Sequence, residues 1–67
     1  MYIVNQTRSE ITNVDCVSYI NIDDTVISAY TVGNIKRVLG QYDNAPKVFQ
    51  DLLNSFSTSV NVLYMPE

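Results

Sequence analysis

Residue types that bind metals or cross-link small domains are scarce or absent in this chain of 67 residues. It has no histidine, no tryptophan and one cysteine, Cys16. A single thiol cannot form an internal disulfide, and without histidine the chain lacks the ligand set of a structural zinc site. Domains this small usually need a disulfide, a metal or a partner chain to bury enough apolar surface. We therefore expect a homo-oligomer that holds no metal and no other cofactor.

Charged residues and long apolar runs are also scarce. Four Lys and Arg residues against seven Asp and Glu give a formal net charge of -3, so nucleic-acid binding is not expected. The longest apolar runs have four residues, against the roughly 20 that a membrane-spanning helix requires. The first six residues lack the basic and apolar segments of a secretory signal peptide. Together with the lone thiol, this predicts a cytoplasmic protein.

The residues that are present predict one folded domain, spanning residues 1–67. Hydrophobic residues make up 46% of the chain, and glycine and proline total four, which is the opposite of a disordered composition. Apolar and β-branched residues form strand-like segments at 2–5, 10–13, 16–22, 25–32, 36–42 and 60–65. Asp23 and Asp24 predict one turn, Gly33 and Asn34 another, and Gly40 a bulge or bend.

One helix is predicted between the last two strand segments. Asp43 and Asn44 can cap it, and Pro46 fits only its first turn. Apolar residues recur on one helical face at positions 48, 49, 52, 53 and 56, and the helix is expected to end within 55–59. The fold class is therefore α+β: a small, mainly antiparallel β-meander of five to six strands, one helix packed on a sheet face, and a final strand.

Three tyrosines, Tyr19, Tyr30 and Tyr42, fall on predicted strands. The sheet face that the helix leaves open is predicted to carry some of these three and Val17. Tyrosine is enriched at interfaces, so these three residues are interpreted as an oligomer or partner surface. The alternative is that they are half-buried sheet aromatics with no partner.

Three of the four basic residues, Arg8, Lys36 and Arg37, lie in or beside predicted turns. They could converge on an anion, since arginine is well shaped for phosphate. In a symmetric oligomer, copies of one basic residue can also meet at an axis. Surface charges mostly have no specific role, so solvated charge that improves solubility is the favoured alternative.

No pattern in the chain indicates catalysis. Histidine is absent and the two glycines are isolated, so there is no phosphate-binding loop. Cys16 has no basic neighbour in sequence that would activate its thiol. Asp23 and Asp24 lack the further oxygen ligands that a hard cation needs. The sequence predicts a protein that is not an enzyme.

Several short segments carry a resemblance to a known group of proteins. They are the opening Met1-Tyr2-Ile3-Val4-Asn5-Gln6, the following Ile11-Thr12-Asn13-Val14-Asp15 with Val17, the strand end Leu39-Gly40-Gln41-Tyr42 and the tail Leu63-Tyr64-Met65-Pro66-Glu67. With the order of the expected elements, they resemble short phage and prophage proteins of Gram-positive bacteria, a group with no assigned activity. The chain departs from that group at the helix start, where Asn44-Ala45-Pro46-Lys47 replaces a charged turn similar to Glu-Arg-Ala-Lys.

The resemblance implies a setting rather than a set of active residues. It implies a homo-oligomeric accessory protein that inhibits or sequesters a host factor in the host cytoplasm, in antiviral defence for example. The target would be a host protein bound through an exposed apolar patch, or a phosphorylated nucleotide signal bound in a pocket between subunits. The alternative is a structural or assembly protein of the virion, with open, repeating contacts.

Overall fold

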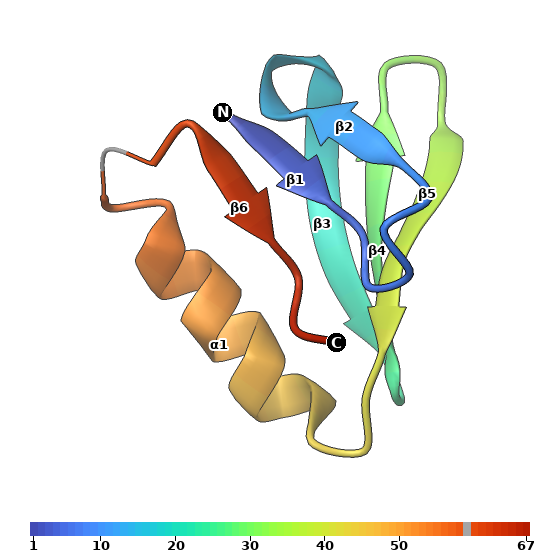
Figure 1. Cartoon of the computed structure of the whole chain (residues 1–67). Coiled ribbons are helices and arrows are strands. Elements are labelled where there is room, and N and C mark those ends of the chain that lie inside the picture. The colour runs from blue at the N-terminus through green and yellow to red at the C-terminus, as the bar shows by residue number, and fades with distance from the viewer. Residues whose placement is uncertain (59) are drawn as a thin grey trace.

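A computed structural model gives the fold and describes residues 1–58 and 60–67. The described residues form β1 (Tyr2–Val4), β2 (Ile11–Asn13), β3 (Val17–Asp23), β4 (Val26–Thr31), β5 (Ile35–Gln41), α1 (Ala45–Ser55) and β6 (Val62–Tyr64). One turn of 3-10 helix, Val14–Cys16, lies between β2 and β3. The predicted α+β class, with one helix before a final strand, is confirmed (Figure 1).

The strands form two sheets, and the prediction of one meandering sheet is wrong. The first sheet has the strand order β2-β1-β6, and the second has the order β3-β4-β5. The second sheet is an antiparallel meander, whereas β1 pairs antiparallel with β2 and parallel with β6. The chain leaves the first sheet at the 3-10 turn, where the Asn13 side chain accepts a hydrogen bond from the Asp15 N–H. It returns through α1, which makes β6 run in the same direction as β1.

The two turns of the second sheet use residues that tolerate a positive φ. Asp24 has a φ of 56°, and it forms the turn with Thr25 because Asp23 already pairs with Val26. This turn begins one residue later than predicted. Gly33 and its successor form the second turn, as predicted, with φ values of 90° and 64°. Aspartate, asparagine and glycine reach this region of backbone conformation at the lowest cost.

A bulge in β3 decides which of its side chains face the core. Val17 pairs with Thr31 and Tyr19 pairs with Tyr30, so β3 has one extra residue between these two pairs. An extra residue shifts the alternation of side chains between the two faces. Val17 consequently packs against the core, while Tyr19 is exposed. Of Val17 and Tyr19, both candidates for the outer face, only Tyr19 lies there.

A second bulge lies in β5 beside Gly40, as predicted. Gly40 pairs with Ile27, and the next pair joins Val38 to Ser28, which leaves Leu39 as the extra residue. Leu39 is fully buried. The extra residue also shifts the alternation of side chains beyond Leu39, which changes the face on which Tyr42 lies.

Tyr42 belongs to the core and not to the predicted partner surface. Only 9% of this residue is exposed. Its ring covers Gly40, where an added Cβ atom would lie 2.5 Å from ring carbon Cε2. The bulge at Leu39 separates Tyr42 from the outward alternation of β5, so its side chain turns inward.

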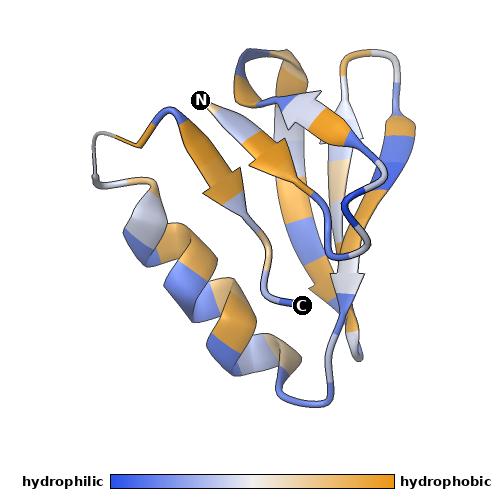
Figure 2. Cartoon of the chain, viewed as in Figure 1, coloured by the Kyte–Doolittle hydropathy of each residue, from blue (hydrophilic) through white to orange (hydrophobic). Residues whose placement is uncertain are grey.

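The core fills the space between the inner faces of the two sheets and α1. Its buried apolar residues are Ile3, Ile27, Ala29, Leu39, Tyr42, Ala45, Val48, Leu52 and Met65. Figure 2 shows that the hydrophilic residues of α1 lie along its outer side, whereas its hydrophobic residues face the strands. Every described buried side-chain nitrogen or oxygen has a hydrogen-bond partner. The polar groups in and around the core are therefore satisfied within the chain itself.

The helix lies between the open edges of β3 and β6 rather than flat across one sheet. One groove separates it from β6 and another separates it from β3. Of the predicted helix face, Val48 and Leu52 are buried and Phe49 packs against the core. Leu53 and Phe56 are exposed. The helix ends at Ser55, within the predicted range, of which Ser59 lies outside the described residues.

The two sheets are joined on the side away from α1 by the β1–β2 turn. The Gln6 N–H donates to the Leu39 carbonyl at 2.8 Å, and the Gln41 N–H donates to Gln6 Oε1 at 2.8 Å. Arg37 and Glu10 form an ion pair across the same junction at 3.4 Å. The six strands and the helix thus surround the core in the circular order β6, β1, β2, β5, β4, β3 and α1.

Candidate functional site

The outer face of the first sheet faces solvent, yet it carries apolar side chains. Cross-strand pairing places Ile11, Val4 and Tyr64 in one row across the sheet. It places Val62 beside Tyr2 in the neighbouring row on the same face. Ile11 is 60% exposed and Tyr64 is 62% exposed. We call these five residues (Tyr2, Val4, Ile11, Val62 and Tyr64) the apolar sheet face.

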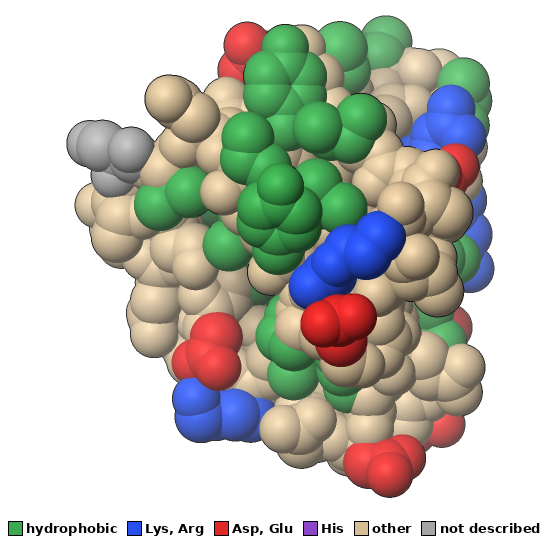
Figure 3. All heavy atoms as spheres, viewed as in Figure 1, with side chains coloured by type: hydrophobic (Ala, Val, Ile, Leu, Met, Phe, Trp, Pro, Cys, Tyr) green, Lys and Arg blue, Asp and Glu red, His purple; other side chains and the backbone are tan. Residues whose placement is uncertain are grey.

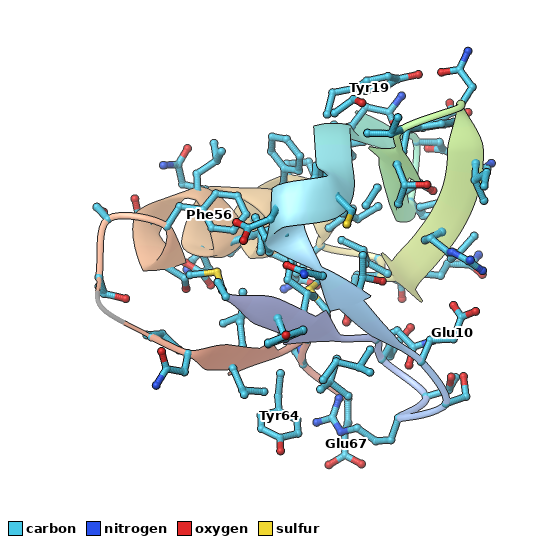
Figure 4. The ribbon with its side chains drawn as sticks, turned by 90° about the horizontal axis from the view of Figure 1, so that it is seen from above. Glu10, Tyr19, Phe56, Tyr64 and Glu67 are labelled. Atoms are coloured by element: carbon cyan, nitrogen blue, oxygen red, sulfur yellow. The ribbon has the colours of Figure 1, made fainter. Side chains whose placement is uncertain are left out.

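The apolar sheet face is continuous and lies away from the core. Figure 3 shows hydrophobic side chains gathered into one patch on this side of the molecule. Figure 4 shows Tyr64 pointing away from the first sheet on the side opposite to α1. A contiguous apolar patch on a small protein is more informative than scattered apolar residues, because such patches mark interaction sites.

Arg8 lies at the margin of the apolar sheet face. Its guanidinium carbon is 5.4 Å from the centre of the Tyr64 ring, which is a cation–π distance. Its Nη1 group donates to the backbone carbonyls of Asn5 at 3.1 Å and Met65 at 2.5 Å. Its Nη2 atom lies 3.9 Å from a carboxylate oxygen of Glu67. The cation is thus engaged within its own chain, where it fixes Tyr64 and the C-terminal residues.

Two further hydrogen bonds hold the C-terminal residues under this face. The Tyr42 hydroxyl donates to the Pro66 carbonyl at 2.5 Å, and Gln6 Nε2 donates to the Glu67 carbonyl at 3.1 Å. Burial raises the pKa of the Tyr42 phenol above its ordinary 10.0, and the nearby Arg8 cation lowers that pKa by less. Tyr42 therefore stays a neutral donor, and the segments 39–42 and 64–67 of the resemblance meet in one structural cluster.

The three basic residues of the predicted anion site do not converge within one chain. Lys36 pairs with Tyr30 and Arg37 pairs with Ala29, so neighbouring side chains of β5 point to opposite faces of the second sheet. Arg37 forms an ion pair with Glu10, while Arg8 is held by the first sheet and the C-terminal residues. A joint phosphate site of Arg8, Lys36 and Arg37 would require more than one chain.

Two of the three tyrosines of the predicted partner surface do lie together. The rings of Tyr19 and Tyr30 stack with centroids 4.6 Å apart and an interplanar angle of 14°. Both lie on the outer face of the second sheet, and Tyr19 is 47% exposed. The prediction is wrong for Tyr42, because this residue is buried beneath the C-terminal residues and cannot contribute to a surface.

A second apolar surface lies between α1 and β3. Tyr19, Leu53 and Phe56 line it with exposed side chains, around a groove whose further apolar residues are Val14, Val17, Ile20, Phe49 and Leu52. We call this the helix–β3 surface. The spacing of Leu53 and Phe56 predicts core positions, but α1 meets the strands with a narrower stripe centred on Val48 and Leu52.

Cys16 and the acidic side chains form no metal-binding cluster in the described part of the chain. Cys16 is exposed, in a cleft that Glu10 and Arg37 also line, with Arg37 already paired. Residues 1–58 and 60–67 contain no group of three or more His, Cys, Asp or Glu side chains that could hold a metal ion. Among the same residues, no helix has the length and apolar character needed to cross a membrane.

The apolar sheet face is the feature that sequence reasoning missed. Alternation alone places Val62 and Tyr64 on one side of β6, and Tyr2 and Val4 on one side of β1. What brings them together is the parallel pairing of β1 with β6, between residues about 60 positions apart. A pattern within either segment carries no signal for such a distant pairing.

Comparisons with protein-family models, with curated proteins and with solved structures gave no match.

Proposed function

We propose that the protein works by binding another protein through the apolar sheet face. The observation that carries this proposal is that four apolar side chains of three short strands are exposed outside the buried core, with the half-buried Val4 between them. Burial of apolar area is worth about 25 cal/mol per Å², and two of these residues are tyrosines, which are enriched at interfaces. Leaving such a face in water has no benefit for folding, so we assign it to recognition.

The biological setting of this proposal rests on the resemblance to phage and prophage proteins. We propose an accessory protein that inhibits or sequesters a host factor in the host cytoplasm, for example one of antiviral defence. We also propose that it acts as a homo-oligomer. The helix–β3 surface, with Tyr19, Leu53 and Phe56, suits self-association because it is separate from the apolar sheet face.

A protein target suits this chain better than a phosphorylated signal molecule. Arg8 and Arg37 are each paired with a carboxylate of the same chain, and Arg8 also serves two backbone carbonyls. A phosphate group would have to displace these partners. A structural role in the virion would use the same apolar face, but with open and repeating contacts.

Native mass spectrometry of the protein recovered from its bacterial host tests the proposed function. The variant Ile11→Lys places a charge in the apolar sheet face, on the strand farthest from β6. Its matched control is Val32→Lys, at a 74% exposed position in the turn after β4. We expect one host protein bound in fixed stoichiometry to the wild type and to the control.

The same spectra show what would contradict the proposal. Ile11→Lys should lose the host protein, or bind it at least tenfold more weakly once both proteins are purified. If Ile11→Lys retains the partner as well as Val32→Lys does, recognition does not use this face. A ladder of open assemblies without a host protein would instead indicate the virion role.

A further inference from the structure

β6 is an edge strand whose outer side presents unpaired backbone groups. In the parallel ladder the Tyr2 N–H donates to the Asn61 carbonyl and the Met65 N–H donates to the Val4 carbonyl. Because a strand alternates the direction of its backbone groups, Val62 and Tyr64 present their N–H and C=O groups away from β1. No turn or side-chain hydrogen bond among the described residues occupies these groups.

A groove runs along this edge, between β6 and α1. The helix contributes Val48, Asp51, Leu52 and Ser55, and the other wall consists of Leu63, Tyr64, Met65 and Pro66. Leu52 and Met65 form a buried apolar floor, being 3% and 1% exposed. The edge thus combines free backbone groups with an apolar trough, which are the two requirements for adding a strand from another molecule.

We propose that the partner protein supplies an extended segment that pairs with the open edge of β6 and becomes the fourth strand of the first sheet. This inference rests on the proposed function, because it names the form in which the partner reaches the apolar sheet face. Alternate side chains of the added segment would lie beside Val62 and Tyr64 on that face. The others would enter the groove above Leu52.

The small area of the site decides between a partner segment and a second copy of this chain. Three strands about 4.8 Å apart and three residues long have a backbone footprint about 10 Å square. A stable dimer buries about 800 Å² on each partner, which is about a fifth of the 4259 Å² that this chain exposes. Two β6 edges would also bring two copies of α1 to the same place, whereas a segment without a helix fits the groove.

Charge sets the chemistry of the added segment. The chain has a net charge of -3, and three of its four basic residues are paired internally. Asp51 lines the groove, with Lys47 2.6 Å from its carboxylate. The complementary segment is therefore extended and alternately apolar, and it is neutral or basic.

Random nine-residue peptides displayed on a carrier and selected on the wild-type protein provide the probe. The strongest selected peptide is synthesised with a fluorophore, and its binding is measured by anisotropy. Val62→Pro removes one outward N–H without touching the ladder to β1, and proline is tolerated where an edge N–H faces solvent. The matched control Val62→Thr keeps that N–H and a β-branched side chain. We expect at least a tenfold loss of affinity for Val62→Pro and less than threefold for Val62→Thr.

A second pair of variants tests the groove without altering the strand. Ser55→Arg fills the groove from the helix, whereas Gln50→Arg adds the same side chain on an exposed part of α1 outside it. Ser55→Arg should weaken peptide binding at least tenfold, and Gln50→Arg should not. Amide hydrogen exchange should slow at Val62 and Tyr64 when the peptide binds. The far-ultraviolet spectrum of each variant shows that it is folded.

Several results would overturn this inference. One is the selection of no peptide, and another is a peptide that binds Val62→Pro and Ser55→Arg as tightly as their controls. If the amides of Val62 and Tyr64 already exchange slowly in the free protein, and exchange still more slowly as its concentration is raised, the edge binds a second copy. If Ile11→Lys abolishes binding of the host protein while both edge variants retain it, the proposed function stands and the added strand does not.

Discussion

Several residues in this chain have structural roles that their residue types alone do not predict. Gly40 leaves room for the ring of Tyr42, and the Tyr42 hydroxyl holds the carbonyl of Pro66. Met65, one residue earlier, is buried. Segments 39–42 and 64–67, which both carry the resemblance, thus share one structural role. Their contacts attach the C-terminal residues beneath the apolar sheet face.

Gly40→Ala should destabilise the fold, because the new methyl group would lie 2.5 Å from the Tyr42 ring. Overpacking of this kind costs about 1–3 kcal/mol, which urea unfolding monitored by circular dichroism will measure. The same substitution in a Tyr42→Ala background should cost clearly less, since the clash is gone. An equal cost in both backgrounds would show that ring contact is not the reason for glycine.

The raised pKa of Tyr42 predicts a loss of stability in alkali. Its neutral form is favoured in the fold, so the contribution is complete below pH 10 and decreases as the pH rises through the raised pKa. In Tyr42→Phe the free energy of unfolding should decline less above pH 10. Absorbance at 295 nm should show a tyrosine ionisation step above the ordinary pKa of 10.0, and that late step should be missing in Tyr42→Phe. A late step that survives the substitution would contradict this assignment.

At the scale of elements, local patterns predict the strands and the helix but not their partners. Alternation in β4 predicts that Ile27 and Ala29 share a face, and both are buried. The turn residues and the helix start are also found at or within one residue of their predicted places. These features depend on neighbours in sequence, which is why the sequence alone can reveal them.

What the sequence could not reveal depends on distant contacts and on single extra residues. The bulges in β3 and β5 decide the faces on which Val17 and Tyr42 lie. The pairing of β1 with β6 creates the apolar sheet face from the two ends of the chain. Arg8 illustrates the same limit, because it lies in a predicted turn yet bonds to Met65, 57 residues away.

Arg8→Gln should destabilise the protein more than Arg37→Gln does. Arg8 donates to the carbonyls of Asn5 and Met65 in a partly buried setting, and hydrogen bonds to a charged group are worth about 1.5–3 kcal/mol when buried. Because the Arg8 side chain is about one-third exposed, we expect a cost of about 1–2 kcal/mol. Arg37 forms an exposed ion pair with Glu10, which is worth less than about 1 kcal/mol. Urea unfolding measures the loss of stability in each variant. Equal losses would contradict the role of Arg8 in holding the C-terminal residues.

At the scale of the whole molecule, two separate apolar surfaces give the proposed self-association and the proposed partner binding a site each. Leu53 and Phe56 belong to the helix–β3 surface, and Tyr64 lies on the opposite side of the first sheet (Figure 4). A small chain with two exposed apolar surfaces gains most from burying both.

Phe56→Ser should therefore shift the protein toward the monomer without unfolding it, since Phe56 is 38% exposed and is not a core residue. Sedimentation velocity over a range of concentrations measures the change, and at least a tenfold weaker association is expected. Ile11→Ser, on the apolar sheet face, serves as the matched control and should leave self-association unchanged. If Ile11→Ser dissociates the oligomer and Phe56→Ser does not, the two surfaces have the opposite roles.

The most direct test of the central claim is an NMR titration of the labelled protein with the partner that native mass spectrometry identifies. We predict that the backbone amide shifts are perturbed most strongly in β1, β2 and β6, with the second sheet nearly unchanged. Perturbations centred on Tyr19 and Phe56, with the first sheet unaffected, would contradict the assignment of the apolar sheet face to recognition.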